Sequence, residues 1–97
     1  MGAGGVPNRV VERIDGRSGD LPTRGAKPNS RYDLYSNNEL IQSRWFDDEG
    51  KVIRNRDYSH QDNKSNHFFP HDHLWMWVKD FPRRGRNPIE PDYEHYN

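Results

Sequence analysis

The sequence contains no cysteine and few apolar residues. The absence of cysteine excludes disulfide bonds, Cys-containing zinc fingers and thiol nucleophiles. Any metal site must therefore be built from histidine, aspartate or glutamate. Hydrophobic residues make up 30% of the 97 residues, well below the usual share of about 45–50%, a count that includes glycine. One small domain with a small core is therefore expected.

The sequence also lacks an excess of charge of either sign and a long apolar run. Lys+Arg and Asp+Glu are equal at 15 each, so net charge does not indicate a nucleic-acid or membrane partner, although a local patch can still serve a nuclease. No stretch approaches the ~18 consecutive apolar residues of a membrane helix. The first residues lack the basic and apolar blocks of a signal peptide, so export would depend on a larger protein.

The distribution of aromatic residues and glycine divides the chain near residue 30. All twelve aromatic residues lie from Tyr32 onward, whereas six of the eight glycines lie at or before Gly25. This composition predicts a flexible, mostly disordered arm over residues 1–28. Its few apolar residues, such as Val10 and Ile14, would form at most a transient helical turn or an edge strand. We expect a compact domain over residues 29–80 and an irregular tail over residues 81–97.

Three consecutive segments have the pattern of β-strands, with turn residues between them. The segments are residues 30–36, 39–46 and 51–58. The pair Asn37-Asn38 tolerates turn conformations, and Gly50 supplies the positive φ that a tight hairpin needs. Together they predict a three-stranded antiparallel meander. Neither face is purely apolar, so we expect a histidine- and aromatic-rich loop or a short helix to cover the sheet. The expected fold class is α+β or mostly β.

Four of the five histidines fall within fourteen residues, namely His60, His67, His71 and His73. Imidazole titrates near neutrality and is the commonest metal ligand among side chains. His71 and His73 stand at i and i+2, which places them on one side of an extended segment. With His67 or His60 supplying a third nitrogen, they would hold zinc or manganese. Alternatively, two histidines would act without a metal as general base and general acid, or the segment is a polar surface loop.

Other polar residues surround the histidines in the sequence. Arg54 and Arg56 share one face of their strand and form a small basic patch close to the histidines, whereas Asp57 lies on the other face. With Lys64 these arginines would neutralise a scissile phosphate, or they would simply pair with cross-strand carboxylates. Asp57 would take part in catalysis or merely orient a neighbour. We slightly favour the metal-free mechanism, because the only acidic residue at a ligand spacing, Asp72, faces away from the histidines.

A longer pattern runs from residue 28 to residue 75. It contains Asp33-Leu-Tyr35, Phe46-Asp-Asp-Glu-Gly50-Lys, Asp57-Tyr-Ser-His60, His67 and Pro70-His71-Asp-His73-Leu-Trp75. This order of hairpin and histidine block resembles a C-terminal domain of bacterial polymorphic toxins, of the type that accompanies YD-repeat and prophage-associated proteins. Ser59 and Gln61 depart from the family pattern, which has aspartate and glycine beside the first histidine.

The resemblance implies a toxin-like effector domain, commonly a nuclease acting on RNA or DNA. In that reading His60, His67, His71, His73 and Asp57 carry the catalysis. The domain would belong to a larger secreted or phage protein, act in the cytoplasm of a target cell and be neutralised by an immunity protein. The alternative is a non-catalytic binding or structural module of a phage or surface protein, with its histidines packed or holding a structural metal.

Overall fold

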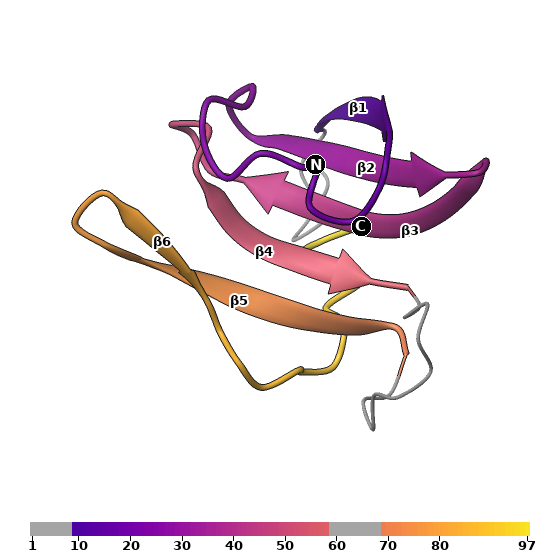
Figure 1. Ribbon diagram of the computed structural model, residues 1–97. Coiled ribbons are helices and arrows are strands. Elements are labelled where there is room, and N and C mark those ends of the chain that lie inside the picture. Colours follow the sequence, from indigo (N-terminus) through magenta and orange to yellow (C-terminus); the bar gives the residue numbers. More distant parts are fainter. Residues whose placement is uncertain (1–8, 59–68) are drawn as a thin grey trace.

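A computed structural model describes residues 9–58 and 69–97, which form one six-stranded mixed sheet (Figure 1). The strands are β1 (Val10–Asp15), β2 (Ser30–Ser36), β3 (Glu39–Phe46), β4 (Val52–Asp57), β5 (His71–Val78) and β6 (Phe81–Arg84). They neighbour one another in chain order; β1 pairs with β2 in parallel, and all other pairs are antiparallel. Among the described residues there is no helix, and therefore none that could cross a membrane. The fold is mostly β.

The predicted meander is confirmed as β2, β3 and β4. Asn37 and Asn38 both have positive φ, 53° and 63°, as the two-residue turn of a type I′ hairpin requires. Gly50 has φ 76°, and a Cβ atom there would clash with the carbonyl oxygen of Ala26. Glycine is therefore needed at this turn both for its backbone conformation and for the close approach of a second segment.

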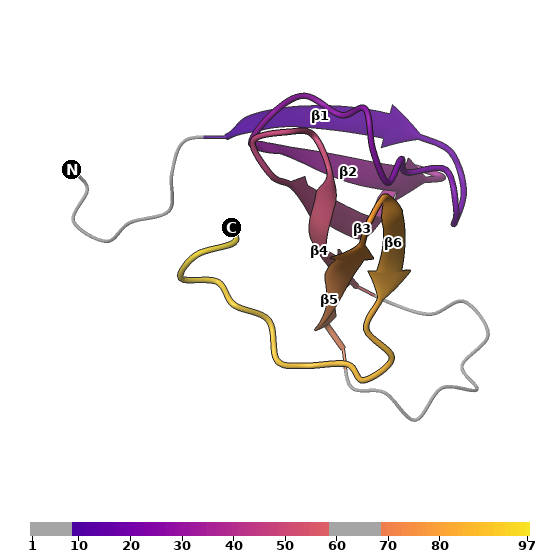
Figure 2. The same ribbon diagram turned by 90° about the vertical axis from the view of Figure 1, so that its left-hand side faces the viewer.

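Within the described residues, the end of the histidine-rich segment extends the sheet as β5, which corrects for His71–Val78 the expectation that a loop or short helix would cover it. β5 pairs with β4 from Asp57 opposite His71 to Arg54 opposite Leu74. The physical reason lies in its sequence, because side chains with aromatic rings recur at alternate positions, at His71, His73, Trp75 and Trp77, and suit a pleated surface. The sheet twists strongly from β1 to β6 (Figure 2). This extension brings the two histidines of β5 beside the end of β4.

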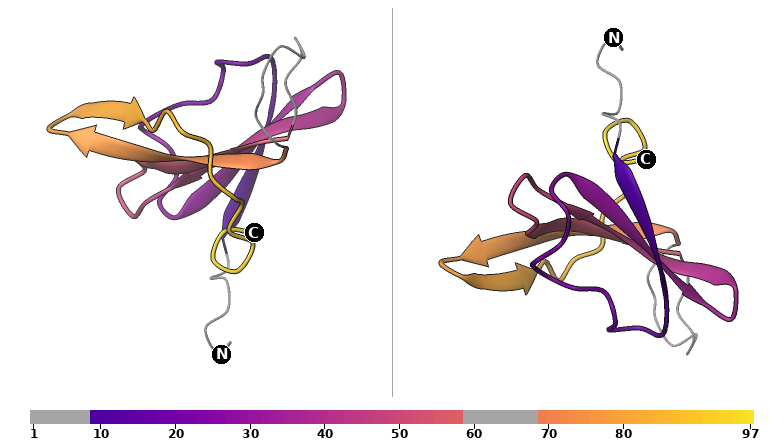
Figure 3. Two further views of the ribbon diagram at one scale, coloured as in Figure 1. Left: turned by 90° about the horizontal axis from the view of Figure 1, so that it is seen from below. Right: turned by 90° about the horizontal axis from the view of Figure 1, so that it is seen from above.

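Two segments without regular strands cover opposite faces of the sheet (Figure 3). Paired residues of neighbouring strands share a face, so the residues of β4 and β5 define two faces by alternation. The histidine face carries Asn55, Asp57, His71, His73 and Trp75; the arginine face carries Arg54, Arg56 and Asp72. Residues 16–29 lie over the histidine face. Ile89 pairs with Asp72 at the edge of β5, and residues 90–97 then lie over the arginine face.

The expected boundaries at residues 28 and 81 do not coincide with the ends of the sheet. Part of the expected arm forms β1, the edge strand that was one alternative for it, and part of the expected tail forms β6. Leu21, also from the arm, is 5% exposed and packs with Leu34 and Ile41. A chain with so few apolar residues uses those of its arm to complete the core. Residues 1–8 of the arm lie outside the described part.

Candidate metal and catalytic site

Three buried side chains meet where the end of β4 pairs with the start of β5. Asp57 is the cross-strand partner of His71, and His73 follows two residues later on the same face. Asp57 Oδ2 lies 3.3 Å from His71 Nε2 and 3.8 Å from His73 Nε2. One ligand atom from each residue lies within 4.8 Å of the others. The group has the composition and spacing to hold a single metal ion.

The surrounding residues fix the orientation of two of these three donors, His73 and Asp57. His73 Nδ1 lies 2.8 Å from the carbonyl oxygen of Gly85, so in the tautomer that donates to this carbonyl, Nε2 presents its lone pair on the side of Asp57. Asp57 Oδ1 accepts hydrogen bonds from Gln42 Nε2 at 2.7 Å and from Asn55 Nδ2 at 3.1 Å. Its other oxygen, Oδ2, is the one that faces the histidines. Such outer partners are typical of metal ligands, whose geometry they hold.

Burial favours the neutral imidazole of His73. Burial is the main reason that the pKa of His73 is lowered. The Gly85 carbonyl and the charge of Asp57 raise this pKa, whereas the charges of Arg84 and His71 lower it further. All three residues of the site are buried: Asp57 is 6% exposed, His71 0% and His73 3%. A neutral imidazole is the form that binds a metal ion. The electrostatics of His73 are therefore compatible with metal binding.

Arg54 and Arg56 lie together, as the alternation of β4 predicts, but on the face opposite the histidines. Arg54 Nε lies 2.6 Å from Asp72 Oδ2, and Arg56 Nε lies 2.7 Å from Asp72 Oδ1. All three residues are buried. Their expected place beside the histidines is therefore corrected, because they neutralise Asp72 across the sheet. The expectation that Asp72 faces away from its neighbouring histidines is confirmed.

Two of the four clustered histidines, His60 and His67, lie outside the described residues, as does Lys64. Of the three histidines expected to hold a metal ion, the structure therefore describes only His71 and His73. The premise that no carboxylate other than Asp72 has a ligand spacing is wrong, because Asp57 supplies one from the neighbouring strand. Its signal in the sequence was alternation, which places Asp57 and Asn55 on the same face. What the sequence did not reveal was the register of β4 against β5.

Comparisons of the chain with protein-family models, with curated proteins and with solved structures found no significant match. The resemblance to polymorphic toxin domains therefore stays a prediction from the sequence, and the function is argued from the site.

Proposed function

We propose that this domain binds one divalent transition metal ion through Asp57, His71 and His73 and acts as a metal-dependent nuclease. The observation that carries the proposal is the convergence of these three buried donors. Imidazole and carboxylate ligands suit zinc, with manganese as the second candidate. Three protein ligands are also the number that catalytic zinc centres provide, their fourth position being taken by water or substrate.

The residues of the site have distinct roles in this proposal. When bound, the ion supplies Lewis-acid chemistry at a phosphoryl oxygen and lowers the pKa of a water molecule. Asp57 contributes the negative charge of the ligand set, and the Gly85 carbonyl keeps His73 in the required tautomer. Gln42 and Asn55 hold Asp57 in place through its Oδ1 atom. These contacts would hold the ligands in position before the ion arrives.

The substrate class comes from the sequence resemblance, which favours an RNA or DNA phosphodiester. On this proposal the domain is the effector part of a larger secreted or phage protein, acts in the cytoplasm of a target cell and meets an immunity protein. A second function is favoured by a different observation, because none of the three donors is more than 6% exposed. Such burial suits a structural ion that ties β4 to β5 in a non-catalytic module.

The test measures zinc binding and nuclease activity on the full chain. We expect one zinc ion per chain, and an affinity that falls more than about 100-fold in Asp57→Asn, His71→Ala and His73→Ala, since loss of an outer partner alone costs about 10- to 100-fold. A chelator should abolish cleavage of RNA or DNA, and zinc or manganese should restore it. His95→Ala is the matched control, because the His95 side chain is 60% exposed and its carboxylate partner is Asp92.

Three other results would point elsewhere. Zinc binding without cleavage, together with a large fall in melting temperature in chelator, would favour the structural module. Cleavage of RNA alone that persists in chelator, with a bell-shaped pH profile, would favour acid–base catalysis by the imidazoles without a metal. Failure to bind either metal, with full cleavage by His71→Ala, would overturn the proposal.

A further inference from the structure

Arg84 on the edge strand β6 places an exposed cation on the histidine face. It pairs in register with Trp75, which lies two residues beyond His73 on the same side of β5. The side chain of Arg84 forms no ion pair or hydrogen bond with any residue that the structure describes. The next residue in the chain, Gly85, places its carbonyl oxygen 2.8 Å from His73 Nδ1. Arg84 is therefore adjacent to a residue that contacts the candidate metal site.

A second cation, Arg44, lies on the same face but is buried. It pairs in register with Asn55 and is 7% exposed. Its Nη1 atom donates to the carbonyl oxygens of Leu21 and Pro22, both at 3.0 Å, and its guanidinium lies 5.0 Å from the centre of the Trp75 ring. No carboxylate of the described residues lies within ion-pair distance of Arg44.

Arg44 remains a cation despite this burial. Burial lowers the pKa of Arg44 to about 10, with the charge of Asp57 opposing the effect and that of Arg84 adding to it. Its Nε atom is also buried without a hydrogen-bond partner. A buried charge normally has a counter-charge close by. Asp57 acts on Arg44 only from beyond ion-pair distance, so the positive charge of this arginine is not locally neutralised.

The arginines on the two faces of the sheet thus differ in whether a carboxylate neutralises them. On the arginine face, Arg54 and Arg56 share the buried carboxylate of Asp72. On the histidine face, Arg44 and Arg84 flank Trp75 with no carboxylate paired to either among the described residues. Two such cations beside one site create a positive local potential that attracts anions. This local potential exists in a chain whose formal net charge is zero.

We propose that Arg84 binds a phosphodiester group of a single-stranded nucleic acid and positions it beside Asp57, His71 and His73. Arg84 supplies the direct contact, since guanidinium donors match phosphate oxygens. Arg44 contributes charge from below the surface. Trp75 and Trp77 are half-buried on the same face, with Arg44 over the ring of Trp75 and Arg24 and Lys51 over the ring of Trp77. Aromatic rings within such a basic track are typical of proteins that bind single strands. The inference rests on the proposed nuclease for its substrate class.

The test measures binding of a fluorescently labelled single-stranded RNA of about ten nucleotides, a length within the usual site size, to the full chain in chelator. Arg84→Gln is compared with Arg83→Gln, which removes the same charge from the same strand. Arg83 is also exposed, but it pairs with Met76 and therefore lies on the opposite face. Anisotropy at several salt concentrations gives the affinity and the number of phosphate contacts.

We expect Arg84→Gln to weaken binding about tenfold and to reduce the slope of log K against log salt by about 0.7, the value for one contact with a single strand. Arg83→Gln should remain within about twofold of the wild type, and both variants should keep its melting temperature. Equal effects of the two substitutions, or none from Arg84→Gln, would overturn the inference. If a double-stranded RNA of the same length bound as tightly, the preference for a single strand would be overturned.

The design separates this inference from the proposed function, because binding is measured without a metal. An Arg84-dependent affinity would stand even if the zinc-loaded protein cleaved nothing. Conversely, zinc-dependent cleavage with no Arg84 effect would leave the nuclease and remove the positioning role. In an active zinc-loaded protein, Arg84→Gln should raise KM about tenfold with a smaller change in kcat, as the loss of a binding contact predicts.

Discussion

At the scale of single residues, the surroundings of His73 bear most directly on the proposed chemistry. Its Nδ1 atom faces the Gly85 carbonyl at 2.8 Å, and its Nε2 atom faces Asp57. Burial is the main cause of its lowered pKa, because an imidazolium loses more hydration on burial than a neutral ring. His73 therefore keeps its metal-binding form to a lower pH than a histidine in water.

The lowered pKa of His73 predicts that the metal-free protein loses stability as the pH falls below about 6.5, the value for an unfolded histidine. Above that pH, both folded and unfolded chains carry the neutral ring. Below it, the unfolded chain takes up a proton that the folded chain resists, until the pH reaches the lower folded-state value. Urea unfolding in chelator between about pH 7.5 and 5.5 measures this loss. His73→Gln should show a shallower dependence, and an unchanged slope would contradict this assignment.

The sequence reveals part of the site because part of it is local. His71 and His73 share a face through alternation within one strand, and this can be read from their spacing alone. The contact of Asp57 with His71 depends on the register of β4 against β5, with residues 58–70 between them. No local pattern sets this register, since side-chain alternation and packing decide it only when both strands are considered. The face on which Arg84 lies is likewise not a local property, because it follows from the pairing of Arg84 with Trp75.

At the scale of elements, β5 serves two different sites through its alternation. His71 and His73 face the candidate metal site, while Asp72 between them points to the arginine face, where it is 0% exposed. Asp72 accepts hydrogen bonds from Arg54 Nε at 2.6 Å and from Arg56 Nε at 2.7 Å. Burial lowers the pKa of Arg56, but the hydrogen bonds and charge of Asp72 outweigh this and raise it overall. The ion pairs join β4 to β5 beneath the site.

Asp72→Asn should destabilise the fold by about 3–5 kcal/mol, because it leaves two buried guanidinium groups without their counter-charge. The free energy of unfolding in urea measures this effect, with circular dichroism to establish that the variant folds. Asp15→Asn is the control, since the Asp15 side chain pairs with Arg13 but is 68% exposed; its unfolding midpoint should stay close to that of the wild type. If the unfolding midpoint of Asp72→Asn were as close to that of the wild type as the midpoint of Asp15→Asn, the two buried ion pairs would contribute nothing to stability.

The strands that the sequence predicts best are those bounded by turn residues. β2 and β3 have the predicted limits, because Asn37 and Asn38 mark the turn between them. β5 was expected to belong to a covering loop or short helix, because neither face of the predicted meander is purely apolar. In the structure its buried polar residues are satisfied by partners on both faces. β6 contains Pro82 and no clear alternation, so its residues gave no local strand signal.

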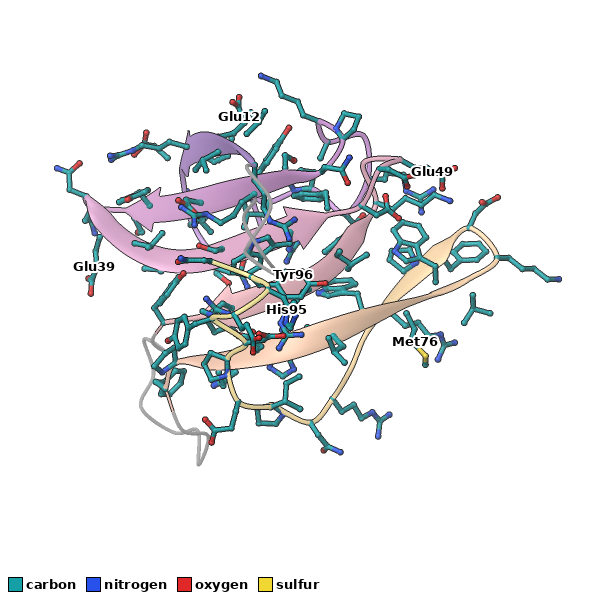
Figure 4. The ribbon with its side chains drawn as sticks, turned by 180° about the vertical axis from the view of Figure 1, so that it is seen from behind. Glu12, Glu39, Glu49, Met76, His95 and Tyr96 are labelled. Atoms are coloured by element: carbon teal, nitrogen blue, oxygen red, sulfur yellow. The ribbon has the colours of Figure 1, made fainter. Side chains whose placement is uncertain are left out.

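At the scale of the whole molecule, arginine–aromatic stacking contributes much of the packing on the arginine face. Tyr96 lies over the sheet from the C-terminal segment (Figure 4). Its ring is 4.9 Å from the Arg54 guanidinium, 5.1 Å from that of Arg9 and 5.7 Å from the Trp45 ring. Such contacts combine the burial of aliphatic stems with cation–π attraction. They show how a chain with 30% hydrophobic residues covers the second face of its sheet.

Tyr96→Ala should therefore lower the free energy of unfolding by about 2 kcal/mol, from the loss of one aromatic pair and two cation–π contacts. Because Tyr96 and the candidate site lie on opposite faces of the sheet, its zinc affinity should remain within about twofold of the wild type, as for distant, independent sites. Urea unfolding in chelator and zinc titration of the folded protein measure the two quantities. His73→Ala provides the opposite pattern, with zinc binding lost and the stacks around Tyr96 intact. Should Tyr96→Ala weaken zinc binding as strongly as His73→Ala, the two faces would be coupled, and the site would depend on packing across the whole sheet.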